Sequence, residues 1–165
     1  MAVESPAREL EFTLEVAAPL PKGDRTQFLI EKLTELGVTR FVALLCERSN
    51  NYPREAKRDK LERFVIEASK QCGRNVLMQI EGPSEWNGYA TRISAGEACI
   101  LAHPSANDVA IGTRAKIMRI AVGPEGGFTD AEVALAVSHG WKTVSLGPRI
   151  LRVETAAIVL AGKTL

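Results

Sequence analysis

The chain has 165 residues, of which 45% are hydrophobic and 25% are charged, and its formal net charge is +1. This composition is typical of a folded globular domain and excludes a largely disordered protein. No apolar run approaches the length of a membrane span, and residues 1–10 lack the apolar stretch of a secretory signal. Cys46, Cys72 and Cys99 are odd in number and form no C-x-x-C pair, which argues against a disulfide framework or a metal site and favours a cytoplasmic protein.

Charge is unevenly distributed along the chain. Residues 22–74 hold 12 Lys and Arg against 8 Asp and Glu, a balance of +4, and the remainder holds 9 against 12, a balance of −3. The first half could therefore present a basic face to nucleic acid, or this difference could simply reflect a solvated surface.

Strand-like and helix-like periodicity alternate from one end of the chain to the other. Asp24 with Gln27 resembles a capping box at the start of the first helix, and Thr129 with Glu132 forms a second one. The predicted segments, in chain order, are a strand at 11–17, a helix at 24–36, a strand at 40–45, a helix at 53–72, a strand at 77–80, a weak helix at 85–92, strands at 98–102 and 116–122, a helix at 130–138, a strand at 143–146 and an apolar helix at 154–163. This alternation predicts a single α/β domain with a mainly parallel sheet covered by helices on both faces.

Three loops, each directly after a predicted strand, are candidates for a ligand site. They cover residues 102–104, 122–128 and 146–152. Ligands of open α/β sheets bind beyond the carboxyl ends of the strands, so the position of these loops favours function. The glycines of 122–128 match no nucleotide-binding fingerprint, and this loop alone could be a simple turn.

The polar residues of these loops allow two interpretations each. Glu125 either accepts hydrogen bonds from a ligand or is an acid favoured at a helix N-terminus. Arg149 and Arg152 with Glu154 suit either phosphate recognition or an internal ion pair. His103 is either a general base or a turn residue.

Outside the three loops, Arg74 stands at a helix exit in the basic half. There it either holds a phosphate or caps carbonyl groups.

The same loops carry a resemblance to a known family. Residues 122–128 with Glu132, and residues 146–156, resemble the paired signature motifs of the ribosomal small-subunit methyltransferase E family, within the SPOUT superfamily of knotted methyltransferases. Shorter matches lie at 21–25, 31–38, 47–49 and 67–75, so the likeness extends over about residues 11–157.

The resemblance implies a C-terminal trefoil knot, which is a rare exception among protein topologies. It also implies a homodimer that binds S-adenosylmethionine and methylates N3 of a uridine in 16S rRNA of the small ribosomal subunit. The residues implied to line the cofactor pocket are Leu101, Ala102, His103, Val122, Gly123, Pro124, Glu125, Gly126, Gly127, Ser145, Leu146, Gly147, Ile150, Leu151 and Arg152.

Catalytic and RNA-binding roles are also implied by the resemblance. Arg152 and Arg74 are candidates to stabilise the uracil oxygens, and Glu154 could orient an arginine. The residues expected to bind RNA are Lys22, Arg48, Arg74, Asn75 and Arg149. We expect neither a metal nor a membrane to take part.

The expected domain organisation departs from the family pattern. Residues 1–10 are expected to form a tail and residues 11–165 the SPOUT methyltransferase domain, with no room for the family's N-terminal PUA-like β-barrel.

Two other functions stay open at this point. One is a knotted methyltransferase with another RNA target, such as a ribose 2′-hydroxyl of tRNA, and the other is a cofactor-binding ribosome-assembly module without turnover.

Overall fold

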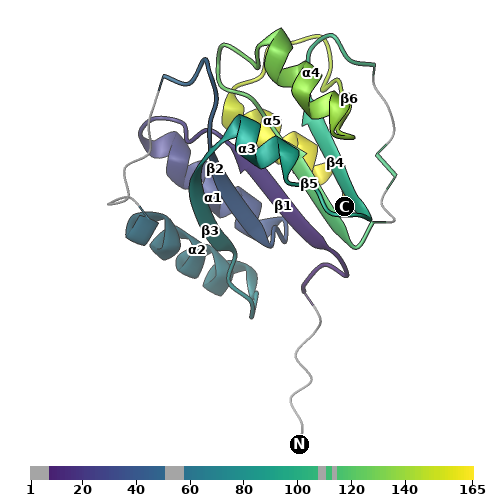
Figure 1. Ribbon diagram of the computed structural model, residues 1–165. Coiled ribbons are helices and arrows are strands. Elements are labelled where there is room, and N and C mark those ends of the chain that lie inside the picture. Colours follow the sequence, from purple (N-terminus) through teal and green to yellow (C-terminus); the bar gives the residue numbers. More distant parts are fainter. Residues whose placement is uncertain (1–7, 51–57, 108–110, 113–114) are drawn as a thin grey trace, which may run out of the picture.

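The computed structural model describes residues 8–50, 58–107, 111–112 and 115–165. In this part of the chain one sheet has six strands in the order β3-β2-β1-β5-β4-β6. The strands are β1 (Thr13–Ala18), β2 (Arg40–Leu45), β3 (Gln79–Glu85), β4 (Glu97–Ala102), β5 (Ile117–Ala121) and β6 (Lys142–Val144). Their pairings are parallel, and the strands therefore point the same way (Figure 1).

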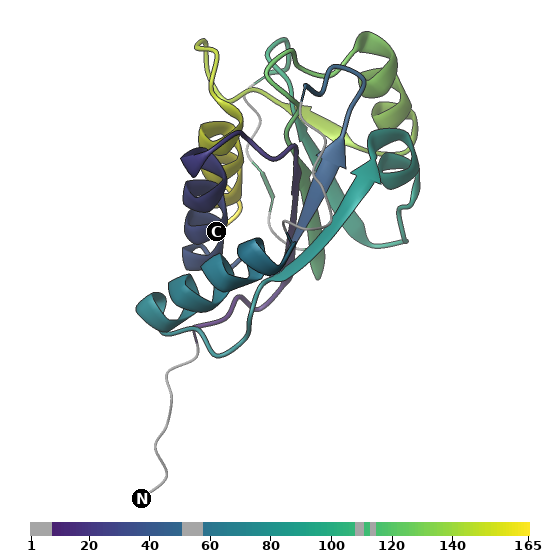
Figure 2. The ribbon, with the colours of Figure 1, turned by 90° about the vertical axis from the view of Figure 1, so that its left-hand side faces the viewer.

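Helices cover both faces of this sheet (Figure 2). They are α1 (Asp24–Glu35), α2 (Arg58–Cys72), α3 (Trp86–Thr91), α4 (Asp130–Ser138) and α5 (Val153–Gly162). Helices α1, α2 and α5 lie on one face, and α3 and α4 lie on the other. The predicted α/β class with a parallel sheet is thus confirmed, while the trefoil knot stays a prediction.

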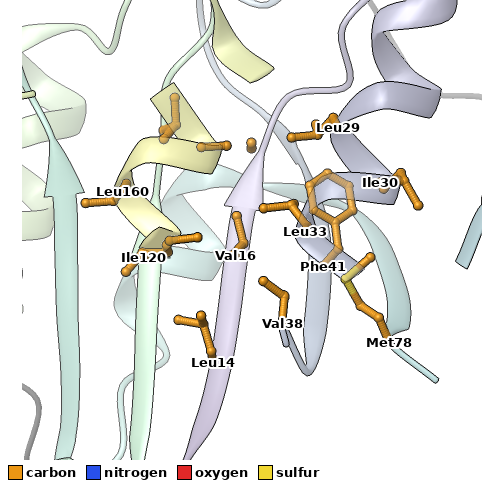
Figure 3. Close-up of a cluster of buried hydrophobic side chains, with 14 of the residues drawn as sticks. Leu14, Val16, Leu29, Ile30, Leu33, Val38, Phe41, Met78, Ile120 and Leu160 are labelled. Carbon is orange, nitrogen blue, oxygen red and sulfur yellow. The ribbon is translucent and has the colours of Figure 1, made fainter. Parts of the chain in front are cut away.

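The larger core lies between the sheet and helices α1, α2 and α5, and Figure 3 shows the part of it around β1, α1 and α5. Leu14 and Val16 of β1 meet Leu29 and Leu33 of α1 there, and Leu160 of α5 closes the cluster. These side chains are fully buried. A parallel sheet packed on both faces needs strands that are apolar on both sides, and five of the six residues of β1 are buried.

The second core contains aromatic side chains beneath α3 and α4. The Trp86 ring lies 4.5 Å from Phe128 and 5.3 Å from Trp141, measured between ring centroids. The indole nitrogen of Trp86 donates to the Glu132 carbonyl, and that of Trp141 donates to the Ala90 carbonyl. Because both polar tips are satisfied, these rings can be buried without an unpaired donor.

A buried ion network crosses the sheet below this aromatic cluster. Glu15 of β1 lies in register with Arg40 on one neighbouring strand and with Arg119 on the other. Its carboxylate accepts hydrogen bonds from Arg119 Nε at 2.9 Å, from Arg40 Nη1 at 3.0 Å and from the Tyr89 hydroxyl at 2.5 Å. Burial and the Glu15 charge raise the pKa of Tyr89 well above its ordinary value, so this hydroxyl remains a donor.

The N-terminal segment is fixed to the domain by residues that the sequence analysis placed in a tail. Arg8 donates to the Cys72 carbonyl at 3.1 Å, and Leu10 packs against the position of Gly37. Between them, Glu9 accepts a 2.7 Å hydrogen bond from Arg74. We call residues 8–10 the N-terminal strap.

The observed helix boundaries lie close to the predicted ones, but one of the two predicted N-terminal caps is wrong. Thr129 and Glu132 form the predicted capping box of α4. The capping box predicted from Asp24 and Gln27 is wrong, because Gly23 is the N-cap of α1 and provides no side chain to accept the hydrogen bond.

Replacing Glu15 with glutamine should lower the free energy of unfolding by about 3 kcal/mol, because Arg119 then loses its closest counter-charge in a buried site. This loss is at the low end of the range for a broken buried ion pair, because Arg119 keeps a second counter-charge. Glu97 Oε2 lies 3.5 Å from Arg119 Nη1. Urea denaturation followed by circular dichroism measures this loss. Lys32→Gln, which breaks the more exposed pair with Glu35, should have a much smaller effect, because solvent screens that pair. Equal effects of both variants would contradict this account of the network.

Candidate functional site

Five loops after strands emerge at one edge of the sheet, which we call the carboxyl edge. They follow β1, β2, β4, β5 and β6. The register aligns their starting points, because Ala17 and Leu101 both pair with Ala121, and Ala102 pairs with Val144. The three loops selected from the sequence are therefore neighbours in space, on β4, β5 and β6.

Backbone hydrogen bonds hold these three loops in place. The Val122 amide donates to the Ala17 carbonyl at 3.0 Å, and the His103 amide donates to the Val144 carbonyl at 2.9 Å. The Ser145 amide then donates to the Asn107 carbonyl at 3.2 Å. We call residues 101–107, 122–128 and 145–152 the crevice loops. The first and third are joined to each other and the middle one is joined to the end of β1, and together they form a rim at the carboxyl edge.

The loop after β2 holds the middle crevice loop from the side. Arg48 Nη1 donates to the Gly126 carbonyl at 2.9 Å, and a Cβ atom at Gly126 would lie 3.3 Å from Arg48 Cβ. Glu132 connects the two loops further, because Oε1 accepts the Glu47 amide at 2.8 Å and Oε2 accepts the Thr129 amide at 2.9 Å. Residue 126 must therefore be small where the two loops meet.

Glycine also matters where the backbone faces open space. The Gly127 amide closes a tight turn on the Pro124 carbonyl at 2.8 Å. Gly127 and Gly147 have positive φ angles of 71° and 103°, and a Cβ atom at either position would meet nothing within 4 Å. A ligand can therefore approach the backbone at both glycines without meeting a side chain. This fits a cofactor that is held largely by backbone groups.

The residues predicted to line the cofactor pocket mostly lie on this rim, but Ile150 does not form part of a wall. Leu146 and Leu151 pack partly against the core on the α1 and α5 side, and Ala102 does the same. Ile150 is 97% exposed at the tip of its loop. In this structure its side chain lines no crevice, so the prediction for Ile150 requires a second molecule that covers it.

The structure corrects the predicted role of Arg74. Its side chain is only 3% exposed and forms the 2.7 Å pair with Glu9. Arg74 Nη1 also donates to the Thr34 and Val38 carbonyls, at 3.0 and 2.9 Å. A guanidinium with these partners cannot reach uracil or phosphate, so Arg74 caps carbonyl groups, as the alternative interpretation held.

The predicted RNA-binding residues divide between two edges of the sheet. Lys22, Arg48 and Arg149 are exposed at the carboxyl edge, although Arg48 also donates to Gly126. Asn75 is exposed but precedes β3, at the opposite edge with Arg74. The five residues thus do not form one surface.

The two residues predicted to be catalytic differ in exposure. Arg152 is exposed and is the N-cap of α5, where its side chain makes no capping hydrogen bond. Glu154 is only 5% exposed, so it cannot contact a substrate directly in this structure. The arginine beside Glu154 is Arg25 of α1, at 3.9 Å from Nη1 to Oε1. Sequence reasoning selected neither this pair nor Arg25, because the two residues are far apart in the chain.

Other side chains offer less chemistry. Burial raises the pKa of Cys46 to about 12 and that of Cys99 to about 11, so both are protonated near neutral pH and are poor nucleophiles. Within the described ranges, no group of three or more His, Cys, Asp or Glu side chains could hold a metal ion. No described helix is long and apolar enough to cross a membrane.

Comparison with known proteins agrees with the geometry of the carboxyl edge. Residues 8–164 match the family model of the RNA methyltransferase domain. The chain is 35% identical over 162 residues to ribosomal RNA small subunit methyltransferase E of Synechocystis sp., covering 94% of this chain and 54% of that protein.

Two solved structures with bound S-adenosylmethionine are also similar. One is a ribosomal RNA small subunit methyltransferase E from Neisseria gonorrhoeae, with a TM-score of 0.88 and 28% identity, covering 96% of this chain and 68% of that one. The other is a methyltransferase from Legionella pneumophila, with a TM-score of 0.84 and 31% identity, covering 94% and 66%. The chain thus spans between about half and two thirds of the length of these proteins.

Glu132→Ala should loosen the contact between the loop after β2 and the loop after β5, because the Glu47 and Thr129 amides lose their shared acceptor. The expected cost is about 2 kcal/mol, from a lost helix cap and a donor left without a partner. Thermal unfolding measures the loss, and hydrogen exchange should be faster at the Glu47 amide. Asp130→Ala in the same helical turn should cost less than about 1 kcal/mol. Unchanged exchange at Glu47 would show that the carboxylate does not join the loops.

Proposed function

Since the chain belongs to the RNA methyltransferase domain family, we propose that it transfers the methyl group of S-adenosylmethionine to N3 of a uridine in 16S rRNA of the small ribosomal subunit. The observation that carries this proposal is the meeting of the three crevice loops at the carboxyl edge, with open space beside the backbone of Gly127 and Gly147. The choice of uridine N3 rests on the signature motifs at 122–128 and 146–156 and on the names of the relatives.

The cofactor supplies an electrophilic methyl group on a sulfonium sulfur. Backbone groups of the crevice loops would hold its adenosine, around Gly127 and Gly147 where a Cβ atom would meet nothing within 4 Å. Because these loops are hydrogen-bonded to the sheet, they would hold the cofactor in one orientation, which matters because transfer needs the acceptor nitrogen in line with the methyl group.

The acceptor imposes a second requirement. N3 of uracil carries a proton as part of an imide, and this proton must pass to solvent before the nitrogen can attack. The N3–methyl bond then forms as the methyl–sulfur bond breaks, and S-adenosylhomocysteine leaves. The base must also leave any stacked arrangement to enter the site. Arg152 is the exposed guanidinium at the end of the third crevice loop, and we place it beside the uracil oxygens, where a positive charge stabilises the anion that forms.

RNA is proposed to approach over the carboxyl edge. Lys22 and Arg149 are exposed on loops there. Arg48 is also exposed, although its Nη1 donates to the Gly126 carbonyl. Positive groups on one edge suit a phosphate backbone, with sequence-independent contacts that weaken as salt rises. An rRNA substrate also implies that the protein acts in the cytoplasm.

A homodimer is proposed from the outward side of α5. After Glu154 and Thr155 in its first turn this helix is apolar, and the residues that do not face the core include Ile158 and the 37% exposed Val159. An apolar helix side of this kind is normally buried. A second copy packed on this side would cover it, and the exposed Ile150 could be covered in the same assembly. The predicted knot and the assignment of residues 11–165 to one SPOUT domain belong to the same proposal.

Gly126→Val should reduce S-adenosylhomocysteine affinity at least about tenfold, because the new side chain collides with Arg48 and displaces the middle crevice loop. Calorimetry measures the affinity, and labelled methyl transfer to unmodified small subunits measures the activity, which should fall with it. Gly88→Val, in open space on α3, is the matched control and should change neither. Unchanged affinity in a folded Gly126→Val protein would refute the site, and transfer to a different nucleotide would refute the substrate.

Val159→Glu should convert the dimer to a monomer, because a carboxylate in this apolar contact would have to lose its hydration when the two copies associate. Light scattering at micromolar concentration gives the mass of each form. Glu67→Ala on the exposed side of α2 serves as the control and should leave the mass unchanged. A wild-type mass equal to one chain would end the dimer proposal.

A further inference from the structure

Glu154 is a buried acid whose carboxylate is incompletely paired. It lies in the first turn of α5, and its side chain is 6% exposed. In the described part of the chain, its Oε2 atom is buried and accepts no hydrogen bond. Burying a carboxylate is costly unless it is paired and hydrogen-bonded, so a residue of this kind needs a reason beyond stability.

The neighbouring positive group is Arg25 in the first turn of α1. Its Nη1 lies 3.9 Å from Glu154 Oε1, which is too long for a hydrogen bond but within the distance of an ion pair. The Arg25 side chain is 36% exposed, in contrast to the buried carboxylate. Arg25 therefore reaches solvent, and it places a positive charge beside the buried carboxylate.

The position of this pair relates it to the crevice. Helices α1 and α5 lie side by side on one face of the sheet (Figure 2). Arg25 follows the carboxyl end of β1, and Glu154 is two residues after Arg152, the last residue of the third crevice loop. The pair is thus at the carboxyl edge, directly beside the rim.

The chemistry of Arg25 is that of an anion site. A guanidinium offers five N–H donors in a fixed plane, and a carboxylate on one side leaves a second edge free to bind another oxyanion through two hydrogen bonds. The N-terminus of α5 adds a partial positive charge at the same place. In the proposed reaction the cofactor, S-adenosylmethionine, carries one anionic group, which is the carboxylate at its methionine end.

We propose that Arg25, held in place by Glu154, binds the methionine carboxylate of S-adenosylmethionine. This inference rests on the proposed function and assigns one part of its cofactor site. Arg25 is the binding residue and Glu154 is a positioning residue that acts through it. Lys22 and Arg149 are exposed and suit a phosphate backbone passing over the surface, whereas the half-buried Arg25 suits a small ligand in the crevice.

Binding of two nucleosides tests the assignment. S-adenosylhomocysteine has the amino-acid end, while 5′-methylthioadenosine has the same adenosine and sulfur without it. In calorimetry with the full chain, Arg25→Ala should weaken S-adenosylhomocysteine about 10- to 100-fold, the value of a charged bidentate contact, and leave 5′-methylthioadenosine unchanged. Arg25→Lys should fall between, because an ammonium cannot form the fork. Glu154→Gln should act in the same direction with a smaller effect.

Arg58→Ala on α2 is the control, since this exposed arginine is paired with Glu62 away from the crevice, and it should alter neither affinity. Circular dichroism establishes that each variant is folded, and Arg25→Ala alone decides the outcome if Glu154→Gln unfolds. Equal affinity of the wild type for both nucleosides overturns the assignment, as does an equal loss of both in Arg25→Ala. Failure of the wild type to bind either nucleoside refutes the proposed function itself. If Arg25→Ala leaves the ratio of the two nucleoside affinities unchanged but weakens the binding of an rRNA fragment, the assignment is overturned and Arg25 binds RNA instead.

Discussion

The parallel register of the sheet is the constraint on which the rest of the structure depends. Because Ala17, Ala121 and Leu101 lie side by side on three adjacent strands, the loops that follow them start at the same level. A slip of one residue would turn each side chain to the opposite face and would remove Glu15 from between Arg40 and Arg119. The buried ion network therefore specifies the register, and the register brings the crevice loops together.

Local patterns predicted the fold well because local physics determines the elements. Arg40–Leu45 and the helix at Asp130–Ser138 are confirmed at their predicted bounds, since an apolar run and a capping box are visible over a few residues. The predicted helix at 53–72 begins at Arg58 in the structure, and its first residues lie outside the described part of the chain. Loop positions after strands likewise led to the three segments that meet at the carboxyl edge.

Pairings between distant residues could not be predicted in the same way. Arg74 stood in a basic segment, but its partner Glu9 is 65 residues away in the N-terminal strap, and only the folded chain brings them together. The pair of Arg25 and Glu154 was missed for the same reason, although Glu154 was expected to orient an arginine. Composition reports how many charges a segment has, whereas burial decides which of them reach solvent.

The N-terminal strap also determines the reach of anything joined to it. Its contacts with Cys72, Arg74 and Gly37 fix residues 8–10 at the edge of the sheet opposite the carboxyl edge, before β1 begins. The six residues of β1 then separate this point from the carboxyl edge by roughly 20 Å, at about 3.3 Å per residue. A module attached ahead of residue 8 would need a tether of at least about six extended residues, or a body of that size, to touch a nucleic acid bound at the crevice. Linker length is thus the quantity to vary when such fusions are designed.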